Sequence, residues 1–243
     1  GFRQSTSLFF GGVTVSGSRS NFPPPGEATL LCFNHPNLLS DPMLIMRACP
    51  RMVRFVAADL LWKKPIISFL VRCAAAVPIK RKSEHAKTDN RAAFSEVSKA
   101  LWRGQCLGVA PEGQSKMRTF LDELQPGIGL MALEAVFDRQ DDDFCVKIVP
   151  CGLTYLQHCR WLSEVVIVFG KPIEVTTSFL RAHGVTPEMT NPRDAPRSRC
   201  LQELMEKVRG GLEAVTLDIR PPTGASAPQA FEGDFVALQR GTS

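Results

Sequence analysis

This sequence of 243 residues lacks the features that mark several large classes of protein. No stretch reaches 18 apolar residues without a charge, and the nearest, from Pro65 to Ile79, is interrupted by Arg72, so no transmembrane helix is predicted. The chain has one tyrosine and no alternation of basic and aromatic residues, so nucleic acid is not the expected partner. It has no G-x-S-x-G pattern either, which disfavours a serine hydrolase with a nucleophile elbow.

The eight cysteines lack the spacing of a metal site or a redox motif. None forms C-x-x-C, and none pairs with a histidine at zinc-finger spacing. Several lie in apolar runs, such as Cys32 in TLLCF and Cys106 in QCLGV. We therefore expect buried, reduced thiols, no bound metal, and a compartment that faces the cytosol.

The composition is that of a folded globular chain, with 44% hydrophobic and 22% charged residues. A chain of this length can bury a core without disulfides. We expect one domain over residues 1–220, followed by a Pro/Gly/Ala-rich tail over 221–243 that is poorly ordered. The first residue is Gly1 rather than Met, so we expect a fragment, and any targeting signal upstream of it is not visible in this sequence.

The net charge of +5 is unevenly distributed along the chain. Between Arg47 and Lys82 there are nine basic residues and one acid, Asp59, which gives this basic segment a charge of +8. Such a segment attracts phosphates of nucleotides, lipid headgroups or nucleic acids, although it could equally be a solvated face.

Short apolar runs alternate with helical patterns, which predicts an α/β fold with a mostly parallel central sheet flanked by helices. Leu201, Leu204 and Val208 begin an amphipathic stripe, and residues 183–199 are expected to form a loop before it. Asp41-Pro42 is expected to cap and start a helix that ends before Pro50. The predicted strands are Val13–Val15, Ala28–Phe33, Val53–Ala57, Cys106–Ala110, Cys145–Val149 and Val165–Phe169.

His35 and Asp41 are the first candidates for chemistry. The predicted strand TLLCF ends just before His35, and α/β sheets bind ligands at the carboxyl ends of their strands. A carboxylate that accepts from one imidazole nitrogen leaves the other free to take a proton from a hydroxyl. The alternative is structural, with Asp41 capping the helix and His35 bonding its loop.

Two glycine patterns have the spacing of nucleotide-binding loops but lack the residue or the preceding strand that such loops need. Gly108–Ser115 has P-loop spacing, but Gln114 stands where the phosphate-binding lysine belongs. Gly127-Ile128-Gly129 fits a dinucleotide pattern, but no buried strand precedes it. The Pro-Glu-Gly in the first pattern is better interpreted as a turn that places Glu112 at the cleft.

Several of these segments form an ordered series that resembles the glycerolipid acyltransferase family, typified by bacterial lysophosphatidate acyltransferase. The resemblance extends from about residue 8 to 218 and is closest to the glycerol-3-phosphate or dihydroxyacetone-phosphate branch. It departs from the family at Ala110, where Phe is usual, and at Gln114-Ser115-Lys116, where Thr-Arg-Ser is common. The matching segments are Asn34-His35-Pro36-Asn37 with Asp41, Val77-Pro78-Ile79-Lys80-Arg81, Ala110-Pro111-Glu112-Gly113, Leu124-Gln125-Pro126-Gly127, and Val149-Pro150 with Gly152-Leu153-Thr154-Tyr155.

The resemblance implies an acyl-CoA-dependent O-acyltransferase that binds no cofactor and acylates glycerol-3-phosphate or dihydroxyacetone phosphate. His35 would take the proton of the acceptor hydroxyl, and Asp41 would orient His35. The acceptor would be bound by Arg81 and Lys80 at its phosphate, by Glu112 and Gly113 at its hydroxyls, and by Lys116 as the cation of the divergent segment.

The expected partners are acyl-CoA, the phosphorylated glycerol acceptor and a membrane surface. The protein is expected to be membrane-associated at the endoplasmic reticulum or its equivalent, with its catalytic domain facing the cytosol. Two alternatives stay open: a lysophosphatidate or lysophospholipid acyltransferase or transacylase, and a non-catalytic module that binds membrane lipids through the basic segment.

Overall fold

Strands and helices alternate along most of the chain, as the sequence predicts. The computed structural model describes residues 12–17, 20–37, 40–58, 77–79, 90–113, 121–156, 164–189 and 194–216. The strands are β1 Gly12–Ser16, β2 Thr29–Phe33, β3 Val53–Ala58, β4 Val77–Ile79, β5 Cys106–Val109, β6 Cys145–Tyr155, β7 Glu164–Phe169 and β8 Ile173–Thr176. The helices are α2 Ser40–Ala48, α4 Arg91–Trp102, α5 Gly127–Arg139, α6 Thr177–Ala182 and α7 Ala195–Glu213.

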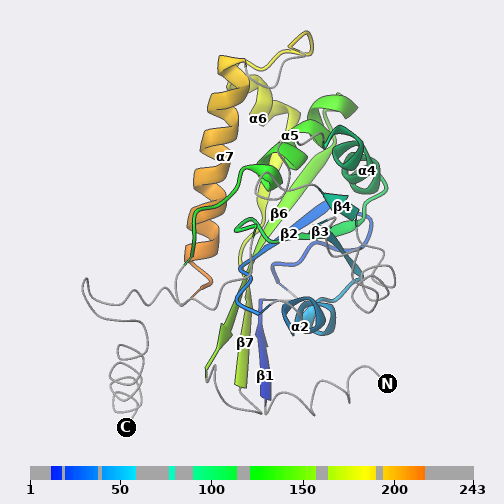
Figure 1. The fold of residues 1–243 in the computed structure, drawn as a ribbon. Helices are drawn as coiled ribbons and strands as arrows, with labels where there is room; N and C mark the ends of the chain where they lie inside the picture. Colours follow the sequence, from blue (N-terminus) through cyan, green and yellow to red (C-terminus); the bar gives the residue numbers. More distant parts are fainter. Residues whose placement is uncertain are drawn as a thin grey trace, which may run out of the picture.

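The described strands form one mixed sheet in the order β1-β7-β6-β2-β5-β3-β4, with β8 paired to β6 (Figure 1). The run from β6 through β2, β5 and β3 to β4 is parallel throughout. Only the pairings of β6 with β7 and with β8 are antiparallel among those described. The predicted mostly parallel sheet is therefore confirmed, and the carboxyl ends of five neighbouring strands meet at one edge.

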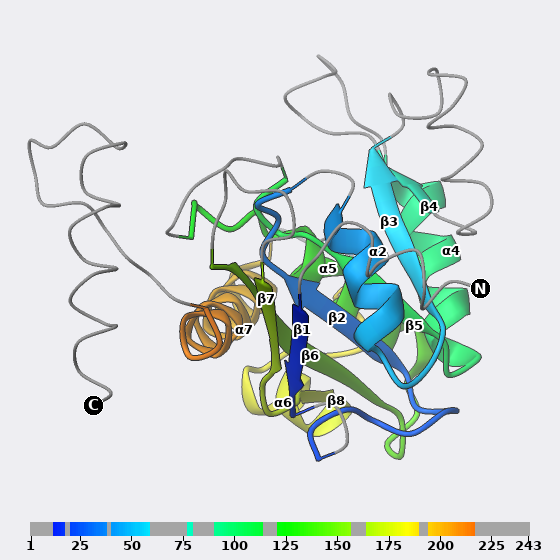
Figure 2. The ribbon, with the colours of Figure 1, turned by 90° about the horizontal axis from the view of Figure 1, so that it is seen from below.

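Helices cover both faces of this sheet, and side chains alternate between two cores along each strand. Leu31 and Phe33 of β2 pack in the core that contains Leu44 and Ile45 of α2. Leu30 of the same strand packs in the other core, which α4, α5, α6 and α7 cover. In Figure 2, α2 lies on the near side of the sheet beside β2 and β3, and α7 lies away from it, beyond β7.

β6 is longer than the sequence predicts, because the expected strand ended at Val149. Its first part pairs with β8 through Cys145–Ile148, and its second part pairs with β7 through Cys151–Tyr155. Pro150 lies in the sequence between the residues that pair with β8 and those that pair with β7. Neither antiparallel ladder therefore requires the backbone N–H that proline lacks. A proline at this changeover does not end the strand, so β6 reaches the carboxyl edge with Tyr155.

α7 also differs from its prediction, since residues 183–199 were expected to be a loop. The helix begins at Ala195, with Pro196 in its first turn. Proline fits there because its fixed φ suits the helix and its missing N–H would have no helical partner. The short strands β4 and β8 were not predicted at all, because three or four residues carry too little periodicity.

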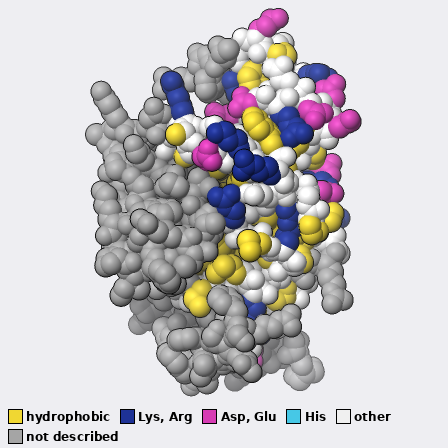
Figure 3. Space-filling view, turned by 90° about the vertical axis from the view of Figure 1, so that its right-hand side faces the viewer, with side chains coloured by type: hydrophobic (Ala, Val, Ile, Leu, Met, Phe, Trp, Pro, Cys, Tyr) yellow, Lys and Arg dark blue, Asp and Glu magenta, His cyan; other side chains and the backbone are white. Residues whose placement is uncertain are grey.

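Two of the described basic residues of the basic segment bond within the fold. Six of its nine basic residues lie outside the described residues. The side chains of Arg51 and Arg54 form hydrogen bonds with other residues of the fold. Arg51 donates to the backbone carbonyls of Pro24 and Glu27, at 2.8 and 3.0 Å, and to that of Gly104. In Figure 3, lysine and arginine side chains gather on the described part of the face that carries α4, with acidic side chains near them.

Some predicted features lie outside the described residues and stay predictions. They include the tail over 221–243 and the boundary before it. Within the described ranges, no helix is both long and apolar enough to cross a membrane.

Candidate functional site

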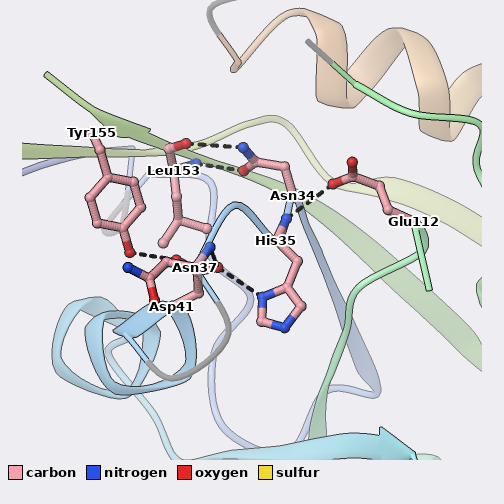
Figure 4. A network of polar contacts seen from close by, with 7 residues as sticks. All are labelled: Asn34, His35, Asn37, Asp41, Glu112, Leu153 and Tyr155. Carbon is pink, nitrogen blue, oxygen red and sulfur yellow. Dashed lines mark hydrogen bonds and ion pairs between the residues drawn. The ribbon is translucent and has the colours of Figure 1, made fainter. Parts of the chain in front are cut away.

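The exit of β2 is held in place by the side chain of Asn34. Its Nδ2 donates to the carbonyl of Leu153 at 3.0 Å, and its Oδ1 accepts from the N–H of Leu153 at 2.7 Å. The amide thus continues the pairing of β2 with β6 for one residue after the β2 strand ends. Because both ends of the amide are engaged, the backbone is oriented at the point where His35 leaves the sheet (Figure 4).

His35 and Asp41 form the pair that their spacing suggested. The His35 Nδ1 lies 2.8 Å from the Asp41 Oδ2, the His35 side chain is 10% exposed, and Asp41 is fully buried. An ionised carboxylate can only accept, so Nδ1 is the donor in this contact, and in a neutral imidazole Nε2 then keeps its lone pair. Among the described residues, none hydrogen bonds Nε2. The imidazole therefore offers one basic nitrogen at the carboxyl edge of the sheet.

Asp41 is oriented by further donors from two other segments. The N–H of Asn37 donates to Oδ2 at 2.8 Å, and the Tyr155 hydroxyl donates to Oδ1. A buried carboxylate keeps its charge only when donors replace the lost water, and three donors do so here. Figure 4 shows Asp41 between His35 and Tyr155.

The expected role of Asp41 as a helix cap is wrong. Asp41 lies inside the first turn of α2, which begins at Ser40. Within the described chain its carboxylate accepts from Asn37, His35 and Tyr155, and from no N–H of α2. The carboxylate contributes to α2 only as a negative charge near the helix N-terminus, which favours the helix dipole.

Glu112 lies beside His35 because β5 is the neighbour of β2 in the sheet. Its Oε1 accepts from the backbone N–H of His35 at 3.0 Å, and its Oε2 accepts from that of Asp122 at 3.3 Å. The carboxylate thus joins the loops that follow β2 and precede α5. Gly113 comes next with a φ of 72°, a left-handed conformation that favours glycine and turns the chain after the carboxylate.

The structure brings together His35, Asp41, Glu112 and Gly113 of the predicted site residues. Lys80, Arg81 and Lys116 lie outside the described residues. Sequence reasoning missed Tyr155 and the role of Asn34, because their partners are more than a hundred positions away. One signal was available for Tyr155, since it is the only tyrosine of the chain and lies in a motif that resembles the family's last one.

The six described cysteines are free, and the buried ones do not resemble nucleophiles. Burial raises the pKa of the Cys106 thiol to about 12, and it also raises the pKa values of Cys32 and Cys151. Such thiols carry almost no thiolate near neutral pH, and the thiolate is the reactive form. Among the described residues, no cluster of three His, Cys, Asp or Glu side chains could hold a metal ion.

A family model named Acyltransferase matches residues 13–154, which is more than half of the chain. Glycerol-3-phosphate O-acyltransferase 1 of Saccharomyces cerevisiae is 36% identical over 132 residues, which cover 54% of this chain and 16% of the relative. Glycerol-3-phosphate O-acyltransferase 2 of the same yeast is 32% identical over 130 residues, which cover 54% and 16%. The chain therefore spans less than a fifth of the length of these curated relatives.

The fold resembles that of a solved bacterial protein. The crystal structure of the 1-acyl-sn-glycerophosphate acyltransferase PlsC from Thermotoga maritima aligns with a TM-score of 0.52. The alignment covers 86% of this chain and 76% of that one, at 18% sequence identity. At this identity the likeness shows a shared α/β architecture.

Proposed function

This chain belongs to the acyltransferase family, and from that premise we propose that it transfers a fatty acyl group from acyl-CoA to a hydroxyl of glycerol-3-phosphate or dihydroxyacetone phosphate. One observation carries the proposal. The Nε2 of His35 bonds none of the described residues at the carboxyl edge of the sheet, while its Nδ1 bonds the buried carboxylate of Asp41. That arrangement suits a general base for a hydroxyl, which is too weak a nucleophile on its own.

In the proposed reaction, Nε2 of His35 takes the acceptor's proton as the acceptor oxygen attacks the thioester carbonyl. The new C–O bond forms, the C–S bond then breaks, and the imidazolium returns its proton to the departing CoA sulfur. Asp41 stabilises the imidazolium in between because it is a buried negative charge 2.8 Å from Nδ1. The thioester is already activated, so a base with correct positioning suffices without an acyl-enzyme.

The acceptor site is proposed beside His35 along the same edge. Glu112 already bonds two backbone N–H groups, and each of its oxygens has a further lone pair that an acceptor hydroxyl can use. Gly113 leaves the approach free of a side chain. β4 ends at Ile79 and runs parallel to β3, so Lys80 and Arg81 follow a strand that points to this edge. We propose that Arg81 and Lys80 bind the acceptor phosphate. Lys116 would supply the positive charge of the divergent segment, Gln114-Ser115-Lys116.

The preference for glycerol-3-phosphate or dihydroxyacetone phosphate rests on relatives. Two yeast proteins that are 36% and 32% identical are named glycerol-3-phosphate O-acyltransferases. A lysophosphatidate or lysophospholipid acceptor is the alternative on the same site. Purified protein should be given labelled acyl-CoA with glycerol-3-phosphate, dihydroxyacetone phosphate and lysophosphatidate in parallel. Fastest transfer to lysophosphatidate would overturn the preferred acceptor, and no transfer to any acceptor would overturn the enzymatic proposal.

We also propose that the protein works at a membrane surface, facing the cytosol at the endoplasmic reticulum or its equivalent. The acylated product is apolar enough to partition into a bilayer, and the basic segment carries +8 over 36 residues. Binding to anionic vesicles should weaken as salt rises, because surface charges are screened over about 8–10 Å. A vesicle-pelleting assay tests this. Binding without any acyl transfer would instead favour the non-catalytic lipid-binding module.

A further inference from the structure

We infer that Tyr155 is a positioning residue of the acyl transfer, acting on His35 through Asp41, an inference that rests on the proposed function. The Tyr155 hydroxyl donates to Oδ1 of Asp41, while Oδ2 of the same carboxylate bonds His35 Nδ1 at 2.8 Å. The three side chains thus form one hydrogen-bonded series from β6 through α2 to the loop after β2 (Figure 4).

The Tyr155 hydroxyl donates its one proton to Asp41 and also forms a hydrogen bond with the Ser40 side chain. The Tyr155 side chain is buried, and its pKa is raised first by that burial and then by the negative charge of Asp41. The phenol therefore keeps its proton throughout any practical assay range. Since Asp41 is fully buried, the hydroxyl replaces one of the water contacts that its charge would otherwise lose.

β6 forms hydrogen bonds at both ends of the turn between His35 and Asp41. Leu153 holds Asn34 through its backbone, and Tyr155 holds Asp41 through its side chain two residues later. Leu153 and Tyr155 lie in the core that α2 covers. One straight strand therefore sets the position of the base and that of its carboxylate partner together.

The hydroxyl should also tune how strongly Asp41 attracts a proton to His35. A donor at Oδ1 shares the carboxylate charge, so removing it concentrates that charge on Oδ2 beside His35. The Tyr155→Phe variant should then hold its imidazolium to higher pH. The other titratable groups around the network are Glu112, which bonds the backbone of His35, and the thiols of Cys32 and Cys151, whose pKa values are raised by burial.

The test compares Tyr155→Phe with the wild-type protein in two measurements. In acyl-transfer assays we expect kcat to fall about 10- to 100-fold with little change in KM, the range of a lost hydrogen bond to a charged group. The acid limb of the pH–rate profile should move to higher pH. In an NMR titration, the midpoint of the His35 imidazole should move in the same direction, and this readout does not require turnover.

Thr154→Val is the matched control, since it also removes one hydroxyl from β6. Successive side chains of a strand point to opposite faces, so Thr154 faces away from the core that holds Tyr155. It should leave the acid limb and the His35 midpoint unchanged.

A double-mutant cycle with Asp41→Asn decides whether Tyr155 acts through Asp41. In that background Tyr155→Phe should no longer move the His35 midpoint, because no carboxylate charge remains to redistribute. An unchanged midpoint in the single variant, or an equal shift in both backgrounds, would overturn the inference. If the wild-type protein transfers no acyl group, the proposed function fails, and the NMR cycle still decides whether the series of hydrogen bonds acts on His35.

Discussion

The two edges of the parallel sheet use polar side chains in opposite ways. At the carboxyl edge, Asp41 and Glu112 orient another residue, His35, whose Nε2 bonds none of the described residues. At the amino edge, Arg51 donates to backbone carbonyls of Pro24, Glu27 and Gly104. The first network leaves a reactive atom available, whereas the second satisfies backbone groups that the strands do not pair.

This difference follows from the direction of the strands. The carboxyl ends of β2, β5 and β6 lie at one edge because these strands run parallel, so side chains from distant parts of the chain converge there. The amino edge instead receives loops that return from helices, and their carbonyls need donors if they are not to be buried unpaired. The two edges should therefore respond differently to substitution. Changes at the carboxyl edge should lower the rate of the reaction, and changes at the amino edge should lower the stability of the fold.

The largest expected effect is at the carboxyl edge. His35→Ala should lower kcat by roughly 10²–10⁴-fold, because the proposed general base is lost, while the thermal melting temperature changes little. Steady-state transfer assays and thermal unfolding measure the two quantities. His183→Ala removes a histidine far from the site and is the control. Full activity of His35→Ala would remove His35 from the chemistry.

Arg81 and Arg51 both come from the basic segment, but they are expected to have different roles at the two edges. Arg81 follows β4 and should bind the acceptor phosphate, so Arg81→Ala should raise the acceptor KM about 10- to 150-fold and hardly change the acyl-CoA KM. Arg81→Lys should recover only part of the loss, since an ammonium cannot form the planar two-point contact. Lys82→Ala is the control, and equal small effects at both positions would move the phosphate site elsewhere.

Glu112→Gln tests whether the proposed reaction depends on the negative charge of Glu112 and its two accepting oxygens, because glutamine has nearly the same shape. Two backbone N–H groups, from His35 and Asp122, point at the two carboxylate oxygens. Glutamine replaces one oxygen with an NH₂ group, so one of these donors would face another donor. We expect kcat to fall about 10-fold, with a modest loss of stability. Wild-type kinetics in Glu112→Gln would show that this bracing does not matter to the reaction.

At the amino edge, Arg51→Ala should destabilise the fold without changing the chemistry. Three carbonyls lose their donor, which should cost about 1–3 kcal/mol of unfolding free energy and several degrees in Tm. Denaturant unfolding gives the free energy, and kcat per folded molecule should stay at the wild-type value. Arg103→Ala, at an exposed position on the same side, is the control. A specific fall in kcat for Arg51→Ala would contradict the division between the two edges.

The smallest expected effect is a pH dependence distant from both edges. His183 bonds the carbonyl of Phe179 at 2.8 Å and Glu203 at 2.6 Å. Both partners only accept, so both contacts are hydrogen bonds at the same time only when the ring is protonated. The pKa of His183 is raised, first by the Phe179 carbonyl and then by Glu203. This pair holds α6 against α7.

A raised pKa in the folded state sets the sign of that effect. The contribution of His183 should be fully present below its unfolded pKa of about 6.5 and should be lost as pH rises through its folded pKa. We expect a fall of about 1–2 °C in Tm over that rise. His183→Gln should flatten this part of the Tm-versus-pH curve, and an unchanged curve would mean that the pair contributes nothing to stability.

Elements with a local pattern could be predicted from the sequence. The apolar run of residues 29–33 predicts β2, the stripe that begins with Leu201, Leu204 and Val208 predicts most of α7, and the short turn between His35 and Asp41 predicts their pairing. The ordered motifs indicated the acyltransferase family, which the family model over residues 13–154 confirms. Each of these elements, and each single motif of the series, depends on residues that are close together in the chain.

Tertiary structure alone decided which distant residues complete the site. Tyr155 reaches Asp41 across 114 positions, and Asn34 reaches Leu153 across 119, because β2 and β6 pair in one register. A shift of one residue would turn Tyr155 to the opposite face of the sheet. The same long-range packing placed Arg51 at the amino edge and turned the Asp41 carboxylate toward His35 and Tyr155 instead of the helix N-terminus, because buried polar groups take the partners that the fold brings within reach.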